Sequence, residues 1–272
     1  MFEEPYRWVE AVGNRRQYLD EQFQQGSPVV ALSYADGILL LSVSRGTPKL
    51  YEIYDRIGLG GMGHPADLEK LRFNILEMAH VEGFNRSPSD VTGSRMVKYG
   101  LAPVIKQAFE EVYKAPFIVK ILLAELGTKA ERDAFITINY DGTFEESKGC
   151  AAIASTPAIQ ADVICALRQN AGLASASLNQ AADAALRAWA IGSLAQRREK
   201  ADEEDHKESP RASSASSPDT TAIESHLRET LIDKIIECAV LERTAPGSSK
   251  YRAIKSDELK HLLPRYLKDS AK

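Results

Sequence analysis

The sequence predicts an α+β protein whose domain is a four-layer αββα sandwich. Apolar runs of strand length fall into three groups along the chain, and two pairs of amphipathic helices separate these groups. Two of the runs flank Ala35-Asp36-Gly37, which is typical of a β-hairpin because glycine adopts positive φ without cost. Residues 38–41 are apolar at consecutive positions, as in a strand covered on both faces. A chain ordered this way can stack two sheets and cover each outer face with a helix pair.

The composition bounds the possible classes of function. The chain has 272 residues, of which 44% are apolar and 26% are charged, and its formal net charge is −4. This length can bury one sizeable core. No basic stripe interleaved with aromatic residues is present, so we expect no nucleic-acid partner. The polar N-terminus, the lack of an apolar run near ~20 residues and three cysteines without close pairing predict a cytoplasmic protein with no membrane partner.

The first predicted element is an amphipathic helix over residues 5–25. Pro5 suits a first helical position, and Gly26 suits the position that follows a helix. Four large apolar residues recur at helical spacing and would share one face. They are Trp8, Val12, Leu19 and Phe23. Periodicity alone leaves two alternatives open, in which this face packs on its own domain or on a neighbouring subunit.

Strands and helices then follow in the order that the sandwich requires. The predicted strands are residues 29–34, 38–44, 49–55, 57–62, 117–126, 134–139 and 150–155. The predicted helices are residues 65–83 and 90–113, before the fifth strand, and residues 157–170 and 177–194, after the seventh. Gly100 and Pro103 predict a kink in the second helix, because proline lacks the N–H that a helix interior needs.

The composition changes abruptly after the segment 27–195, which forms most of the predicted core. Residues 196–221 are dense in Glu, Lys, Ser and Pro, so we expect a disordered or mobile insertion there. Residues 222–267 would complete the core with strands at 235–242 and 251–254 and a helix that Ser256 caps. The pattern at 223–234 fits a helix or a strand, and residues 268–272 form a tail.

The search for a catalytic, metal or cofactor site gives no candidate. The five histidines lack the spacing of a zinc site, and the cysteines stand in apolar surroundings that predict inert thiols. The glycine-rich residues 58–63 lack the Lys-Ser/Thr of a phosphate-binding loop and the spacing of a dinucleotide fold, and no Gly-x-Ser-x-Gly elbow exists. Glycines here predict instead that a helix or another chain approaches the strand closely. We therefore expect no metal and no cofactor.

The order of these motifs resembles that of proteasome subunits. PVVALSYADGILLLSVSR followed by PKLYEIYDRIGLGGMG is similar to their opening strands, and DVTG is similar to a helix start in actinobacterial α subunits. FITINYDGTFEES and the closing IIECAVLER continue the resemblance, which covers essentially the whole chain except residues 196–234. It implies the αββα fold of the Ntn-hydrolase superfamily.

The resemblance also implies which type of subunit this is. Catalytic β subunits use an N-terminal threonine whose own amine serves as the base. Ser27 stands at the threonine's place, Lys49 matches their lysine, and Val43 replaces their acidic residue. The helix at residues 5–25 matches the unprocessed helix of α subunits, so we expect a non-catalytic α subunit. One alternative is an autoprocessed Ntn-type peptidase with Ser27 as its N-terminal nucleophile, and another is a ring-forming protein without a β partner.

The family implies roles for the remaining site residues. Lys49 and Gly63 align with pockets of α rings that receive the C-terminal carboxylate of a ring-shaped ATPase or other activator; the alternative is that Lys49 pairs with an acid such as Glu52. Residues 1–26 would combine a gate segment with a ring-packing helix. The implied partners are further copies in a homomeric seven-membered ring, a β subunit that carries the threonine-type endopeptidase activity, and protein substrates in transit to degradation.

Overall fold

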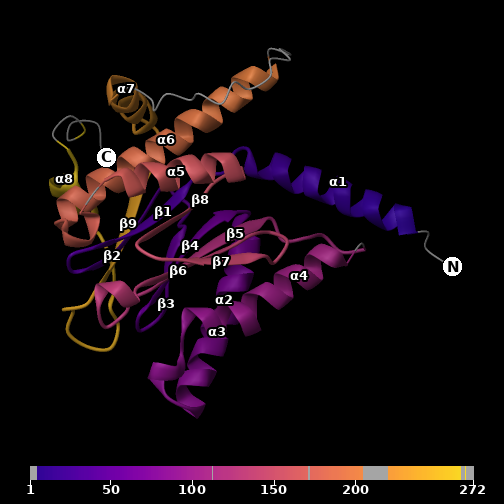
Figure 1. The fold of residues 1–272 in the computed structure, drawn as a ribbon, viewed down its shortest axis with the longest axis horizontal. Coiled ribbons are helices and arrows are strands. Elements are labelled where there is room, and N and C mark those ends of the chain that lie inside the picture. The colour runs from indigo at the N-terminus through magenta and orange to yellow at the C-terminus, as the bar shows by residue number, and fades with distance from the viewer. Residues whose placement is uncertain (1–4, 112, 171, 205–219, 265–266, 268–272) are drawn as a thin grey trace.

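The computed structural model describes residues 5–111, 113–170, 172–204, 220–264 and 267. Two antiparallel five-stranded sheets lie face to face, and helices cover their outer faces (Figure 1). The strand orders are β10-β9-β2-β1-β8 in the first sheet and β3-β4-β5-β6-β7 in the second. The predicted αββα sandwich is therefore confirmed.

The first sheet is built around the predicted hairpin. Its strands are β1 (Val29–Tyr34), β2 (Gly37–Ser44), β8 (Cys150–Ile153), β9 (Ile235–Glu242) and β10 (Tyr251–Ala253). Tyr34 pairs with Gly37 across a two-residue turn. Gly37 does not have the positive φ that the sequence led us to expect. A Cβ atom there would lie 1.8 Å from the carbonyl oxygen of Leu241, so the close approach of β9 is what requires glycine.

In the second sheet the glycine-rich strand is β4, which lies between β3 and β5. Its strands are β3 (Leu50–Tyr54), β4 (Ile57–Gly63), β5 (Val119–Glu125), β6 (Ala134–Ile138) and β7 (Phe144–Ser147). A Cβ atom on Gly60 would lie 2.6 Å from Cγ1 of Val29 in the other sheet, and one on Gly61 would lie 2.3 Å from Cδ1 of Leu68. The glycines thus admit a helix, as predicted, and also the facing sheet, which was not predicted.

The helices on the second sheet differ in part from their prediction. They are α2 (Pro65–Asn85), α3 (Gly93–Arg95), a π-helical turn (Met96–Leu101) and α4 (Ala102–Glu110). The predicted single helix over residues 90–113 is therefore divided, and the disruption expected from Gly100 and Pro103 takes the form of the π-helical turn. Short 3-10 turns lie at Pro88–Asp90, Ala130–Arg132 and Leu173–Ser175.

The helices on the first sheet are α5 (Pro157–Gln169), α6 (Leu178–Glu204), α7 (Thr220–Thr230) and α8 (Ser256–Leu262). α6 continues through residues 196–204, which we expected to belong to the insertion; these residues are rich in Arg, Glu and Lys, which favour helices. The undecided stretch at 223–234 begins as the helix α7 and ends at β9. The rest of the predicted insertion, residues 205–219, lies outside the described residues.

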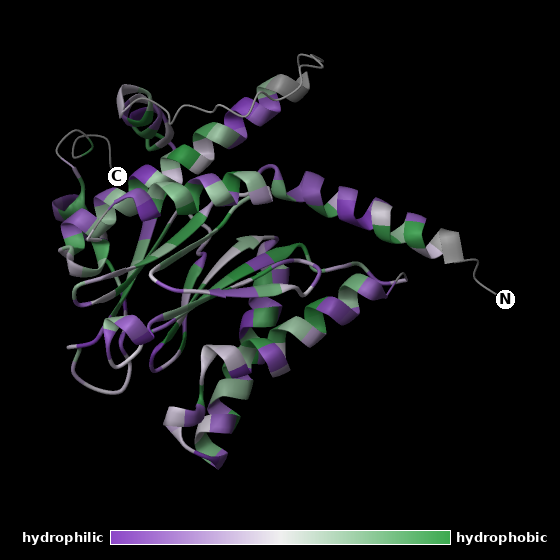
Figure 2. Cartoon of the chain, in the orientation of Figure 1, coloured by the Kyte–Doolittle hydropathy of each residue, from purple (hydrophilic) through white to green (hydrophobic). Residues whose placement is uncertain are grey.

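Three apolar clusters fill the three spaces between the layers, and hydrophobic colour marks both strands and the helices that cover them in Figure 2. The cluster between the sheets includes Leu19 and Phe23 from α1 (Pro5–Phe23). The C-terminal end of α1 therefore inserts into the sandwich, while its N-terminal half projects away from it (Figure 1). The packing of this end of α1 between the sheets places the candidate site at the junction of α1 and β1.

Candidate functional site

The segment that links α1 to β1 is built into the fold. The Gly26 N–H donates to the Phe23 carbonyl at 2.8 Å, and the Gln196 side chain donates to the Gly26 carbonyl at 3.0 Å. A Cβ atom on Gly26 would lie 2.7 Å from the sulfur of Met62, so a larger residue here would force the buried Met62 side chain to move. Together with the fully buried Phe23, these contacts hold the backbone immediately before Ser27.

The Ser27 hydroxyl is engaged in structural hydrogen bonds. It donates to the Val43 carbonyl at 2.6 Å and accepts from the Trp189 indole N–H at 3.0 Å. A serine hydroxyl becomes a nucleophile only when a base takes its proton, whereas this proton points at a backbone carbonyl. In the unprocessed chain the Ser27 nitrogen lies in the peptide bond with Gly26, and it would become the free amine of such a site only after removal of residues 1–26. The fully buried Val43 side chain cannot replace an acid.

Lys49 lies half-buried just before β3. Its backbone N–H and that of Leu50 donate to the Glu237 carboxylate of β9, at 2.8–3.1 Å. Burial lowers the pKa of the Lys49 ammonium to about 8; the charge of Glu237 opposes this shift and that of Lys234 adds to it. Within the described part of the chain, no ion pair joins Lys49 to Glu52, whose carboxylate accepts a hydrogen bond from Ser249.

Gly63 has a structural reason to be glycine. Its φ is 132°, a left-handed value that other residues rarely adopt, and an added Cβ atom would lie 2.0 Å from the carbonyl oxygen of Ile118. The neighbouring His64 N–H donates to that same carbonyl at 2.7 Å. Gly63 therefore ends β4 where the residue that precedes β5 passes close by.

A hollow of about 380 Å³ brings these residues together. Ser27, Val43, Lys49 and Gly63 all line it. The docking role of Lys49 and Gly63 stays a prediction. Sequence reasoning missed three other cations in the lining, namely Arg45, Lys200 and Lys234. Arg45 lies two residues after Val43 and could have been found by proximity, but Lys200 and Lys234 come from stretches that we had assigned to the insertion or left undecided.

A family model described as "Proteasome subunit" matches residues 23–192, which is more than half of the chain. The chain belongs to the proteasome subunit family. Curated relatives named "Proteasome subunit alpha" include proteins from Actinosynnema mirum, 35% identical over 135 residues, and from Salinispora tropica, 34% identical over 172 residues. These matches cover 49% and 62% of this chain, and 51% and 63% of the relatives. The chain thus spans about half to two thirds of the relatives it matches, and the predicted resemblance to actinobacterial α subunits is confirmed.

The apolar face of α1 is divided between two surroundings. Leu19 and Phe23 are fully buried in the core between the sheets, and Val12 packs against that core. Trp8 and Val9, in the projecting half, are 41% and 69% exposed. The packing of this face on its own domain therefore accounts for the C-terminal half only, and packing on a neighbouring subunit stays a prediction for the rest.

His226 lies on α7 beside the Ser27 site. It is buried, its ring stacks on Trp189 with 6.4 Å between the ring centres, and its Nε2 lies 2.9 Å from the Ser193 hydroxyl. Its Nδ1 is buried and has no hydrogen-bond partner among the described residues. Burial, followed by the charge of Arg197, lowers the pKa of His226. The neutral ring therefore belongs to the packing between α6 and α7.

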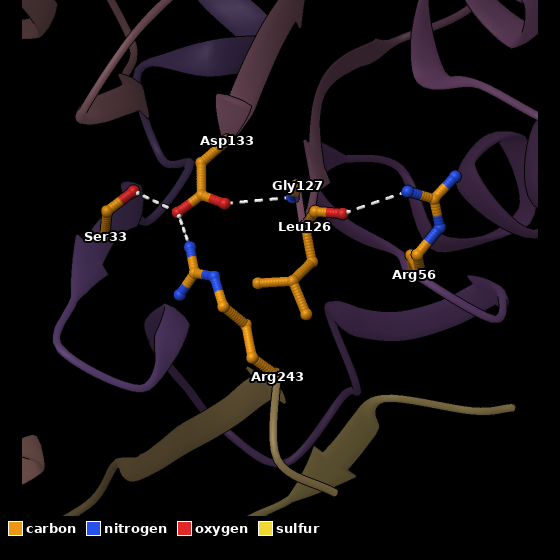
Figure 3. Close-up of polar contacts among 6 residues, drawn as sticks. All are labelled: Ser33, Arg56, Leu126, Gly127, Asp133 and Arg243. Carbon is orange, nitrogen blue, oxygen red and sulfur yellow. Dashed lines mark hydrogen bonds and ion pairs between the residues drawn. The ribbon is translucent and has the colours of Figure 1, made fainter. Parts of the chain in front are cut away.

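A buried polar cluster that the sequence did not reveal joins distant segments of the chain (Figure 3). The fully buried Asp133 carboxylate accepts hydrogen bonds from the Ser33 hydroxyl and the Gly127 N–H, both at 2.9 Å, and forms an ion pair with Arg243. Ser33 belongs to the first sheet, and Asp133 immediately precedes β6 of the second. The cluster is a clamp between the sheets rather than a reactive site, because solvent does not reach the carboxylate.

The described residues offer no metal centre, since no three His, Cys, Asp or Glu side chains among them are grouped to hold an ion. None of the helices in the described ranges is both long and apolar enough to cross a bilayer.

Proposed function

We propose that this chain is a non-catalytic α-ring subunit of a proteasome core particle, where it gates the access of substrates and docks the C-termini of an activator. The observation that carries the proposal is the Ser27 site, in which the hydroxyl is hydrogen-bonded to a carbonyl and the preceding residues are packed into the fold. A β subunit would then carry the catalytic activity of the complex, which is that of a threonine-type endopeptidase.

The docking role is supported by the hollow beside Lys49. A half-buried ammonium at the wall of a hollow is suited to bind a carboxylate, because the ligand's charge replaces water that burial has removed. Gly63 also lines this hollow and places no side chain in it. A protein C-terminus provides such a carboxylate, and a ring-shaped ATPase or another activator is the partner that the family resemblance favours.

Assembly into a ring is supported by large apolar residues that are exposed on separate elements. They are Trp8 and Val9 on α1, Phe73 and Phe84 on α2, and Tyr99 on the π-helical turn. Protein interfaces bury apolar side chains of this kind. Exposed apolar residues on separate elements suit a chain that contacts neighbours in a homomeric seven-membered ring and also a stacked ring of β subunits.

The gate and the substrates follow from the same proposal. Residues 1–4, the expected gate segment, lie outside the described residues. The described N-terminal half of α1 projects away from the sandwich (Figure 1), which supports a gate that extends from the body of the subunit. Proteins in transit to the β chamber, in the cytoplasm, are the proposed substrates.

Co-expression with the proteasome β subunit of the same genome tests this function. We expect a stoichiometric complex in which this chain retains residues 1–26 by intact mass while the β chain is shortened. Ser27→Ala should leave peptide hydrolysis by the complex unchanged. A mass that begins at Ser27, or hydrolysis that is lost in Ser27→Ala, would instead identify the autoprocessed peptidase.

The docking role is tested by comparing two substrates. We expect hydrolysis of folded proteins to require the activator, whereas hydrolysis of short peptides does not. Lys49→Ala should abolish stimulation by the activator and leave hydrolysis of short peptides intact. Lys148→Ala is the matched control, because it removes the same charge from an exposed side chain between β7 and β8. Equal loss in both variants, or in neither, would argue against a docking role for Lys49.

A further inference from the structure

Four cations line the hollow beside Lys49, and they come from separate parts of the chain. Arg45 follows β2, Lys49 precedes β3, Lys200 lies near the end of α6, and Lys234 immediately precedes β9. Among the described residues that line this hollow, none is Asp or Glu. The whole chain has a formal net charge of −4, so this is a local excess of positive charge in an acidic protein.

The cations lie close enough to repel one another. Burial lowers the pKa of Lys234, the charges of Arg45 and Lys200 lower it further, and Asp233 opposes the shift. Lys234 acts in the same direction on Lys49. Each ammonium would therefore be stabilised by an anion placed in the hollow.

Three carboxylates lie near the cluster, and none neutralises it. Glu229 of the adjoining hollow pairs with Arg197. Asp233 lies 4.0 Å from the Arg45 guanidinium in a pair whose side chains are 61% and 80% exposed, and such pairs contribute little. Glu237 accepts hydrogen bonds from the backbone N–H groups of Lys49 and Leu50, so its oxygens are already engaged. The hollow thus keeps a net positive charge.

A second hollow, of about 330 Å³, continues from the first. Arg45, Lys200 and Lys234 line both hollows, whereas Lys49 lines only the first. A peptide whose terminal carboxylate lies at Lys49 can therefore extend past the other three cations. Asp233 and Glu229 also line the second hollow, but Asp233 forms only the exposed pair with Arg45 and Glu229 pairs with Arg197. A single terminal carboxylate at Lys49 would therefore add no negative charge beside Lys200 and Lys234.

We propose that Arg45, Lys200 and Lys234 form a subsite for an acidic side chain that lies upstream of the activator's C-terminal carboxylate. The occupant is a protein C-terminus with two negative charges, one at its terminal carboxylate and one on an Asp or Glu a few residues earlier. This inference rests on the proposed docking role of Lys49. Lys200 and Lys234 lie outside residues 23–192, so the subsite depends on a part of the chain beyond the family match.

Binding of fluorescent synthetic peptides to the assembled protein tests the subsite. One set of peptides ends in a free carboxylate and carries a single Glu at successive positions before its end; the matched set carries Gln at those positions. We expect the best Glu peptide to bind about three- to tenfold more tightly than its Gln counterpart. This advantage should shrink at high salt, because the subsite is open to solvent.

Variants of the chain separate the subsite from the carboxylate dock. The double substitution Lys200→Gln and Lys234→Gln should remove the preference for Glu, while binding still requires the free carboxylate. Lys148→Gln should retain the preference, since this lysine lies between β7 and β8 and lines neither hollow. A preference that survives in the double variant would overturn the subsite.

The peptide set also distinguishes the two proposals from each other. Equal binding of the Glu and Gln peptides to the unmodified protein, with both requiring the free carboxylate, overturns the subsite and leaves the docking role of Lys49 intact. Peptides that bind no better with a free carboxylate than with an amide overturn both proposals. A Glu preference that the double variant loses supports both.

Discussion

Replacing Asp133 by asparagine should destabilise the sandwich more than any other single polar substitution considered above. The amide keeps one oxygen that can accept from the Gly127 N–H, and the Ser33 hydroxyl can turn to accept from the new NH₂ group. Arg243 cannot adapt in this way, because a guanidinium has donors only. Its side chain is 17% exposed, so Asp133→Asn leaves an unpaired and largely buried charge.

The expected cost follows from that burial. Removing one partner of a buried ion pair costs about 3–5 kcal/mol, whereas replacing both partners by apolar groups is often close to neutral. Asp133→Asn should therefore lower the free energy of unfolding by about 3–5 kcal/mol. Adding Arg243→Met should restore most of this loss, because the unpaired charge is then gone. Ser33→Ala removes one hydrogen bond and should cost only about 1 kcal/mol.

Urea denaturation of the isolated chain measures these differences. The fully buried Trp189 provides a fluorescence signal for unfolding, and an unchanged m-value licenses comparison of the midpoints. Arg86→Met is the matched control, since Arg86 pairs with Glu82 on the surface and is 58% exposed; in the Asp133→Asn background it should restore nothing. A cost below about 1 kcal/mol for Asp133→Asn, or further destabilisation by Arg243→Met, would refute the clamp.

Three further predictions concern α1, the docking hollow and α7. Leu19→Ala should lower the free energy of unfolding by about 2–5 kcal/mol, because Leu19 is fully buried. Trp8→Ser should change it by less than about 0.5 kcal/mol and should instead reduce ring assembly in native mass spectra. Equal effects of the two variants on stability would contradict the division of α1. Binding of carboxylate peptides should weaken as the pH rises through about 8, where the Lys49 ammonium deprotonates, and Lys49→Arg should bind with no such fall. Because burial lowers the pKa of His226, the unfolded chain binds its proton more readily, so stability should fall as the pH drops below about 6.5. His226→Gln should flatten that slope in urea titrations, and an unaltered slope would exclude the histidine as its cause.

Local patterns in the sequence were enough to predict most elements of the fold. The hairpin at Asp36-Gly37, the helix after Pro5 and the strands of both sheets follow from apolar spacing and turn residues, which act within a few positions of the chain. The resemblance to a known family singled out Ser27, Val43 and Lys49. That all three line one hollow is a finding of the structure.

Predictions from the sequence were wrong where contacts between distant positions of the chain determine the structure. Gly37 was expected for its backbone freedom, yet β9, about two hundred residues later in the chain, is what requires it. The end of α6 was predicted as part of a mobile insertion, because its own composition offers little to bury. Contacts to other segments, such as that of Gln196 with Gly26, give this stretch its partners.

The sequence by itself thus determined the kinds of element, their order and the family, because periodicity and turn chemistry are local properties. Only the tertiary structure decided which charges meet. Asp133 and Arg243 are 110 positions apart, and Lys200 and Lys234 reach the Lys49 hollow from either side of an undescribed segment. No spacing rule links such residues, since the packing of sheets and helices brings them together only after the chain has folded.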